Sequence, residues 1–164
     1  MQIGNDFYCN YTETVSDEFI DTLNDDFFPS LIQQQLDKAY ELRIFYLHGN
    51  YYSMAIFSQS DQQTCVDFRK YNDKKPNRTV PFCLPSCIEE KIKCFMMTMN
   101  LNSGSIDMIV TKKNDYVFLE VNPVGQFGMV SGPCNYRLEK EIATYLIRMS
   151  LNEKQKKYSN GKSK

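Results

Sequence analysis

Hydrophobic residues gather in two short runs on either side of a polar turn in the first third of the chain. The runs read YELRIFYL and YYSMAIF, and His48, Gly49 and Asn50 form the turn between them. Aromatic and β-branched residues fit the pleated surface of a strand. Glycine and asparagine in a short connection between two such runs are typical of a β-hairpin. The pattern therefore predicts two paired antiparallel strands between residues 40 and 59.

Apolar residues recur at helical spacing in two later segments, at about residues 86–100 and 135–150. Ser86 and Glu89 have the spacing of a capping box at the start of the first segment. Recurrence every three or four positions places the apolar residues on one side of each helix. They are Ile88, Ile92, Phe95, Met96 and Met99 in the first segment, and Leu138, Ile142, Leu146 and Met149 in the second. We expect both helices to pack on the same apolar face of the sheet.

Shorter elements lie before and between these segments. Ser16 is positioned to cap a short helix over SDEFIDTLND. The segment LIQQQL at 31–36 is expected to be extended, and CVDFR at 65–69 is a candidate strand. Residues 70–82 are polar, basic and contain proline, which predicts a loop.

A second hairpin carries the candidate chemistry. The segment SIDMIVTKKNDYVFLEVN reads as two strands around a turn at 112–115, so that Thr111 faces Tyr116 and Asp107 faces Glu120. Because side chains alternate along a strand, one face of this hairpin is entirely apolar and is expected to be the core side. That face holds Ile106, Met108, Val110, Val117, Leu119 and Val121, and the opposite face holds Ser105, Asp107, Glu120 and Asn122.

Two carboxylates opposite each other on paired strands repel, and one of them is expected to have a raised pKa. A divalent cation between Asp107 and Glu120 would remove this repulsion. Carboxylate and amide oxygens are the ligands that Mg²⁺ and Mn²⁺ prefer, and Asn122 adds an amide one diagonal step away. The alternative is a solvated pair of acids on an exposed sheet face.

Composition changes this picture little. The 164 residues suffice for one domain with a core, and the formal net charge of -1 indicates neither nucleic acid nor an anionic membrane as a partner. The sequence has no apolar run long enough for a transmembrane helix, and its N-terminus lacks the pattern of a signal peptide. We therefore expect a cytoplasmic protein.

Six cysteines raise the hypothesis of a thiol-bound metal. Cys83, Cys87 and Cys94 are the closest in sequence, but their spacing lacks the paired motifs of zinc sites, and the single histidine, His48, is distant. Reduced thiols that pack as small apolar groups are the favoured interpretation.

The motifs as a group resemble the C-terminal half of ATP-grasp ligases. The resemblance runs from about residue 27 to 147 and is strongest to the branch that matures microviridin-type graspetides, especially the grasp-with-spasm peptide maturases. It is carried by QQQLDKAYELR, SQ, VDFRKYN, the LP before a helix, GSIDMI, and FLEVNPVGQFGMV followed by CNYRLEKEIA.

This resemblance implies an α+β fold, an ATP-grasp C-terminal subdomain with an antiparallel sheet and helices packed on one face. It implies ATP and Mg²⁺ or Mn²⁺ as cofactors and a ribosomal precursor peptide as substrate. A carboxylate of the peptide is phosphorylated by ATP, and a hydroxyl or amine of the same peptide displaces the phosphate to give an ester or amide.

The resemblance also implies roles for individual residues. Asp107, Glu120 and Asn122 match the metal ligands. Gln34 and Leu36 match the segment that meets adenine, and Glu41 matches a ribose-binding acid. Arg43 and Arg69 match catalytic or nucleotide-binding residues near the phosphates, and Gln126 is expected to shape the peptide site or the turn.

The sequence departs from the family in length. It contains neither the N-terminal domain nor a glycine-rich phosphate loop, so we expect residues 1–26 to be an N-terminal remnant, 27–150 the ATP-grasp subdomain and 151–164 a disordered basic tail. Two interpretations follow: a truncated or split ligase that is inactive without a separate N-terminal half, or a non-catalytic peptide- or partner-binding module that keeps the half-fold.

Overall fold

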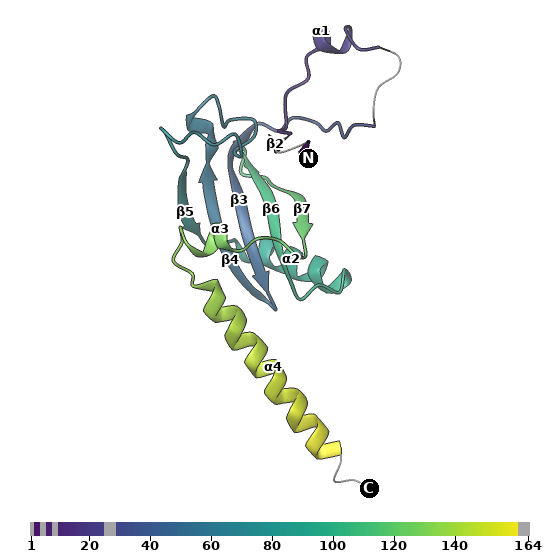
Figure 1. Ribbon diagram of the computed structural model, residues 1–164, viewed down its shortest axis with the longest axis vertical. Coiled ribbons are helices and arrows are strands. Elements are labelled where there is room, and N and C mark those ends of the chain that lie inside the picture. Colours follow the sequence, from purple (N-terminus) through teal and green to yellow (C-terminus); the bar gives the residue numbers. More distant parts are fainter. Residues whose placement is uncertain (1, 4–5, 8–9, 25–28, 161–164) are drawn as a thin grey trace.

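The computed structural model describes residues 2–3, 6–7, 10–24 and 29–160, with only the backbone given for residues 2–3, 6–7 and 154–160. A five-stranded sheet in the order β5-β4-β3-β6-β7 forms the centre, and every neighbouring pair is antiparallel (Figure 1). Its strands are β3 (Lys38–Leu47), β4 (Asn50–Phe57), β5 (Arg78–Phe82), β6 (Ser103–Thr111) and β7 (Tyr116–Asn122). The α+β class and both hairpins expected from the sequence are confirmed.

The remaining elements are short, apart from two helices. They are β1 (Gln2–Ile3) and β2 (Asp6–Phe7), which pair with each other, a 3₁₀ turn at Ser58–Ser60, α1 (Asp17–Ile20), α2 (Ser86–Thr98), α3 (Gly128–Ser131) and α4 (Leu138–Asn160). Ser16 caps α1 through its side chain, as expected. In α2, Pro85 takes the N-cap position without a side-chain hydrogen bond and Ser86 is the first helical residue, so the expected capping box is wrong. No helix in the described ranges combines the length and apolar character needed to cross a membrane.

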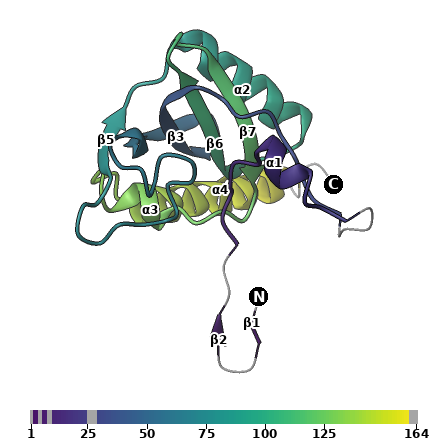
Figure 2. The same cartoon turned by 90° about the horizontal axis from the view of Figure 1, so that it is seen from above.

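The helices divide between the two faces of the sheet, and the expectation that they share one face is wrong. Leu42 and Ile44 of β3 pack in the core beneath α2, whereas Phe45 and Leu47 pack with α3 and the first turn of α4 (Figure 2). Apolar residues stand on both faces of β3, so each face needs its own cover. The sheet is therefore the middle of three layers.

A β-bulge in β7 sets the pairing of the second hairpin. Asp107 pairs with Glu120 as expected, but Met108 pairs with Phe118, and Leu119 has no partner on β6. Nearer the turn, Val110 pairs with Tyr116, one position from the expected register. The extra residue Leu119 compensates for this shift and restores the Asp107–Glu120 pair.

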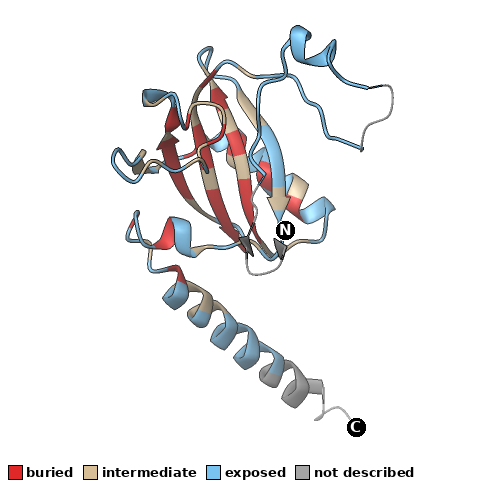
Figure 3. Cartoon of the chain, turned by 45° about the horizontal axis from the view of Figure 1, so that its top comes forward, coloured by how far each residue is buried: buried red, intermediate tan, exposed pale blue. Residues whose placement is uncertain are grey.

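The bulge also decides which side chains of β7 face α2. Phe118 contacts Phe95 of α2, with ring centroids 4.9 Å apart. Leu119 is 44% exposed, so its expected burial is wrong. Figure 3 shows most of this edge strand as exposed. Ile106 is fully buried and Val121 packs at the margin of the core, so the central part of the hairpin is oriented as expected.

One strand expectation and one loop expectation are also corrected. Residues 65–69 form turns rather than a strand, and residues 78–82, expected in a loop, form the edge strand β5. Pro81 lies in this strand, where its missing N–H is tolerated because an edge strand has one unpaired side.

Helix α4 extends away from the sheet (Figure 1). Leu138 is fully buried and Ile142 is partly buried, but Leu146 is 59% exposed, so its expected burial is wrong. The helix continues to Asn160, past the expected end at residue 150, and residues 161–164 of the expected tail lie outside the described residues.

Candidate functional site

Three charged residues form a row across three neighbouring strands. Arg43 of β3 pairs with Asp107 of β6, and Asp107 pairs in turn with Glu120 of β7. Paired residues of antiparallel strands project from the same face of a sheet, so all three side chains share the face that α3 covers in part. The spacing in the sequence predicted the second pair, whereas the contact of Arg43 with Asp107 required the register of β3 against β6.

The guanidinium of Arg43 contacts both carboxylate oxygens of Asp107 through a single nitrogen. Nη1 donates to Oδ1 at 2.8 Å and to Oδ2 at 2.5 Å. Both side chains are mostly shielded from solvent, with 17% and 20% exposure. Burial raises the pKa of the Asp107 carboxyl group; the charge of Arg43 opposes this rise, and the neighbouring Glu120 adds to it. Asp107 therefore sits where extra positive charge would stabilise its ionised form.

The turn after Glu120 folds back onto β6. The side-chain oxygen of Asn122 accepts a hydrogen bond from the N–H of Val124 at 3.0 Å, and the N–H of Gly125 donates to the carbonyl of Asn122 at 3.0 Å. A Cβ atom on Gly125 would lie 2.4 Å from the Cβ of Ser105, so only glycine fits this approach. The turn thereby fixes the Asn122 amide at the end of β7, next to the acidic row.

The donor set suits a hard divalent cation. Asp107 and Glu120 supply carboxylates from facing positions, and the Asn122 amide oxygen has a second lone pair beside the one that Val124 uses. The described residues contain no group of three or more histidine, cysteine, aspartate or glutamate side chains arranged to hold a metal. Two carboxylates and one amide leave coordination positions for water and phosphate oxygens, as Mg²⁺ prefers.

Glu41 projects from the same face of β3 but is already fully engaged. One of its carboxylate oxygens accepts from Nζ of Lys38 at 2.5 Å, and the other accepts from Oγ of Ser58 at 2.6 Å. Glu41 is only 5% exposed, and Lys38 also donates to the carbonyl of Val66 at 2.9 Å. The network ties β3 to the loop that follows β4. Lys38 and Ser58 lie within motifs that carry the resemblance, but the sequence assigned neither a role, because neither motif shows a contact with Glu41.

Arg69 lies in that same loop and pairs with Asp67. Its Nη2 is 2.6 Å from Oδ2 of Asp67, and 53% of its side chain is exposed. Burial raises the pKa of Asp67, but hydrogen bonds from Arg69 and from the N–H of Thr12 outweigh it and lower the pKa to about 2. Gln34, exposed, and Leu36, half-buried, lie on the irregular segment that leads into β3.

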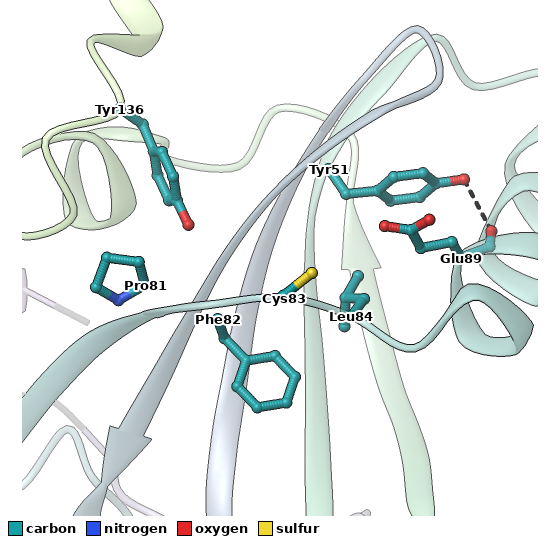
Figure 4. Close-up of a pocket in the computed structure, with 7 residues that line it drawn as sticks. All are labelled: Tyr51, Pro81, Phe82, Cys83, Leu84, Glu89 and Tyr136. Atoms are coloured by element: carbon teal, nitrogen blue, oxygen red, sulfur yellow. Dashed lines mark hydrogen bonds between the residues drawn. The ribbon is translucent and has the colours of Figure 1, made fainter.

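An open pocket of about 310 Å³ lies elsewhere, beside β4, β5 and the start of α2. Figure 4 shows the rings of Tyr51 and Tyr136 on either side of it, with the carboxylate of Glu89 on the Tyr51 side. The Tyr51 hydroxyl donates to the carbonyl of Glu89 at 2.8 Å, and the Tyr136 hydroxyl donates to the carbonyl of Ser53 at 2.7 Å. None of the predicted site residues lines this pocket.

The cysteines form no metal site in the part of the chain that the structure describes. Cys83, Cys87 and Cys94 are exposed free thiols, and Cys134 is buried in the core between the sheet and α4. Burial raises the pKa of the Cys134 thiol, which favours its neutral form. Cys134 packs as a small apolar group, as expected, whereas the exposed Cys83, Cys87 and Cys94 do not.

Comparisons with known proteins rest on solved structures, since no protein-family model and no curated protein sequence matches this chain. The RiPP-associated ATP-grasp ligase of Chryseobacterium gregarium, solved with ADP and a leader and core peptide, is 33% identical over 58% of this chain and 28% of its own, with a TM-score of 0.53. Macrocyclase MdnC of Microcystis aeruginosa MRC, bound with precursor peptide MdnA, is 34% identical over 69% of this chain and 31% of its own, with a TM-score of 0.56.

Macrocyclase MdnB of the same organism is 28% identical over 71% of this chain and 40% of its own, again with a TM-score of 0.56. The fold is therefore that of ATP-grasp ligases. Among these, the chain is similar to ligases that act in RiPP biosynthesis, and the resemblance inferred from its motifs is confirmed. The chain spans about a third of the length of the ligases it matches.

Proposed function

We propose that this chain is the metal- and phosphate-binding part of an ATP-dependent ligase that crosslinks side chains of a ribosomally made peptide. The observation that carries the proposal is the row formed by Asp107 and Glu120, with Asn122 beside it, on a sheet similar to those of RiPP ATP-grasp ligases. The Chryseobacterium gregarium ligase was solved with ADP and a leader and core peptide, and MdnC with a precursor peptide, which supports nucleotide and peptide as ligands here.

The reaction that fits this site joins two groups of one peptide. A peptide carboxylate attacks the terminal phosphorus of ATP, which gives an acyl phosphate and ADP. A hydroxyl or amine of the peptide then attacks the acyl carbon and releases phosphate, so that each ester or amide bond forms with net loss of one water. When bound, Mg²⁺ neutralises charge on the phosphate oxygens during the transfer.

The residues of this chain then have defined tasks. Asp107 and Glu120 would hold the cation with their carboxylates, and Asn122 would add its amide oxygen. Arg43 and Arg69 would bind phosphate oxygens, a role that suits the planar guanidinium. Gln34 and Leu36 would meet the adenine through their backbone. Glu41 would act on the ribose only if it left Lys38 or Ser58, so we assign it instead to holding the loop after β4.

A second function has one observation in its favour. The ion pair of Arg43 with Asp107 satisfies the most buried acid of the row without any cation. A non-catalytic peptide-binding module that keeps the ATP-grasp sheet would need no more than this. Such a module and a ligase part differ in whether they bind a divalent cation.

Mn²⁺ binding in the presence of ADP, followed by electron paramagnetic resonance, tests the proposal. We expect binding to the unaltered chain and about tenfold or greater weakening in Asp107→Asn and Glu120→Gln, because each substitution removes an anionic ligand. Glu90→Gln, at an exposed acid of α2, is the matched control and should bind as the parent does. Equal Mn²⁺ affinity in all four proteins would reject the metal site and favour the binding module.

A further inference from the structure

The contact of Arg43 with Asp107 has the geometry of a chelated cation. A single nitrogen, Nη1, contacts both carboxylate oxygens, at 2.8 and 2.5 Å. A metal ion that Asp107 held with both oxygens would occupy this same position between them. The guanidinium and a cation bound in this way therefore compete for the same two oxygens of Asp107.

The position of Arg43 leaves one of its hydrogen-bond donors unsatisfied. Its Nε is buried and has no hydrogen-bond partner among the described residues. Glu41, the other acid on this face of β3, is occupied by Lys38 and Ser58 and so offers Arg43 no second anion. Glu120 is exposed on β7, and β6 with Asp107 lies between it and Arg43. A buried donor without a partner favours any rearrangement that supplies it with an acceptor.

We propose that Arg43 makes the site selective for a cation that arrives together with phosphate. The inference rests on the proposed function and adds a specificity role for one residue. A bare cation that bound Asp107 would displace the Arg43 guanidinium. The guanidinium would then lie close to the positive charge of the cation and would have no anion to pair with. A cation bound to a polyphosphate brings oxygens that accept from the freed guanidinium, including its Nε. Arg43 therefore weakens binding of the bare cation and couples cation binding to nucleotide binding.

Coupling of this kind is reciprocal and can be measured from either ligand. In the unaltered chain, ADP should strengthen Mn²⁺ binding strongly, because the phosphates relieve the competition. In Arg43→Gln the competition is absent, so Mn²⁺ alone should bind about tenfold tighter than to the parent, the order expected when one unit charge is removed at close range in a partly exposed site. The strengthening by ADP should shrink accordingly.

The experiment measures Mn²⁺ affinity by electron paramagnetic resonance, without and with ADP, for the parent, Arg43→Gln and Arg78→Gln. Arg78 lies on β5 at the opposite edge of the sheet, over the ring of Phe57, so its removal matches the change in net charge. We expect tighter binding of bare Mn²⁺ only in Arg43→Gln. Equal or weaker binding in that variant would overturn the inference, even where Glu120→Gln confirms the metal site.

A measurement on the unaltered chain covers the case in which Arg43→Gln does not fold. In a nitrogen-labelled sample, the side-chain Nε–H of Arg43 should exchange slowly with solvent because it is buried. Saturating Mg²⁺ with ADP should shift this signal, while that of Arg78 should stay unchanged. If Mg²⁺ with ADP does not shift the Arg43 signal, the guanidinium stays on Asp107, and its proposed displacement by the cation is contradicted. Absence of Mn²⁺ binding in every protein would reject the proposed function and this inference together.

Discussion

Glu120 lies directly opposite Asp107 because Leu119, the residue before Glu120 on β7, pairs with no residue of β6. The pairing near the turn is one position away from a regular register, and the bulge cancels that shift before the acids are reached. Bulges often occur beside functional sites, where they re-aim a side chain. Here the bulge allows Phe118 to pack against Phe95 of α2, while Glu120 projects from the opposite face of the sheet.

Deletion of Leu119 should therefore be tolerated. Without it, Phe118 still pairs with Met108 and Glu120 still pairs with Asp107, now in regular alternation. We expect the free energy of unfolding in urea to fall by no more than about 1 kcal/mol, because an exposed side chain is lost.

Deletion of Val121 is the control for this experiment. It would place Asn122 opposite the fully buried Ile106, and a polar amide in the core should cost several times more. A deletion of Leu119 that unfolds the chain, while that of Val121 does not, would show that the bulge is assigned to the wrong residue.

Replacement of Glu120 should change stability and metal binding in opposite directions. Like charges on facing residues of a strand pair are destabilising, so Glu120→Gln should stabilise the cation-free chain by about 0.2–1 kcal/mol. The same change should weaken Mn²⁺ binding, because an anionic ligand is lost. Thermal unfolding with and without Mn²⁺ measures both effects, and Glu90→Gln should change neither. A loss of stability in cation-free Glu120→Gln would mean that Glu120 makes a favourable contact that outweighs the repulsion.

The sequence predicted this acidic pair because alternation in two short strands needs only local information. It missed the bulge, because Leu119 and Phe118 are both apolar and either can be placed on the core side. The partner of Asp107 was missed for a different reason. Arg43 is 64 residues away in the chain, and its register against β6 depends on the whole sheet.

Burial in α4 shows a further limit of sequence patterns. Leu138 and Leu146 occupy equivalent positions on one side of the helix, yet the first is fully buried and the second is 59% exposed. Helical periodicity identifies a side of the helix but does not say how far along its length a neighbour covers it. The division of helices between two faces was missed for a related reason, since Phe45 and Leu47 were not recognised as a second apolar face.

Gly125 should tolerate no side chain. In Gly125→Ala the new Cβ would lie 2.4 Å from the Cβ of Ser105, so the turn or β6 must shift. We expect a loss of about 1–3 kcal/mol in the free energy of unfolding, together with weaker Mn²⁺ binding, because Asn122 anchors the same turn. Gly128→Ala is the matched control, since a Cβ there meets nothing within 4 Å. Equal unfolding curves for the two variants would indicate that the turn lies farther from Ser105.

Asp67 should contribute stability that disappears in acid. Its pKa is lowered from 3.8 to about 2 in the folded chain, so its ionised form is favoured by folding. A group with a lowered folded pKa stabilises the protein above its unfolded pKa and loses that effect as the pH falls through the folded value. The parent should therefore be more stable than Asp67→Asn at neutral pH, and the difference should shrink below about pH 4 and vanish below about pH 2. Urea unfolding at several pH values measures it, and a difference that does not shrink between pH 4 and pH 2 would assign the effect to lost hydrogen bonds.

The 164-residue chain alone should release no ADP from ATP above the rate without protein. Phosphoryl transfer depends on donors fixed around the developing charge, and loss of one such donor commonly costs about 10²–10³ in rate. The chain supplies the acidic row and candidate arginines, but it matches only 31% of MdnC, and its sequence contains no glycine-rich phosphate loop. Adding the unmatched part of MdnC as a separate chain should restore at least weak nucleotide binding, because it supplies the part of the ligase that this chain does not match. Coupled detection of ADP measures turnover, and equilibrium dialysis measures binding. Turnover by the chain alone that Glu120→Gln abolishes would show that these residues suffice for phosphoryl transfer.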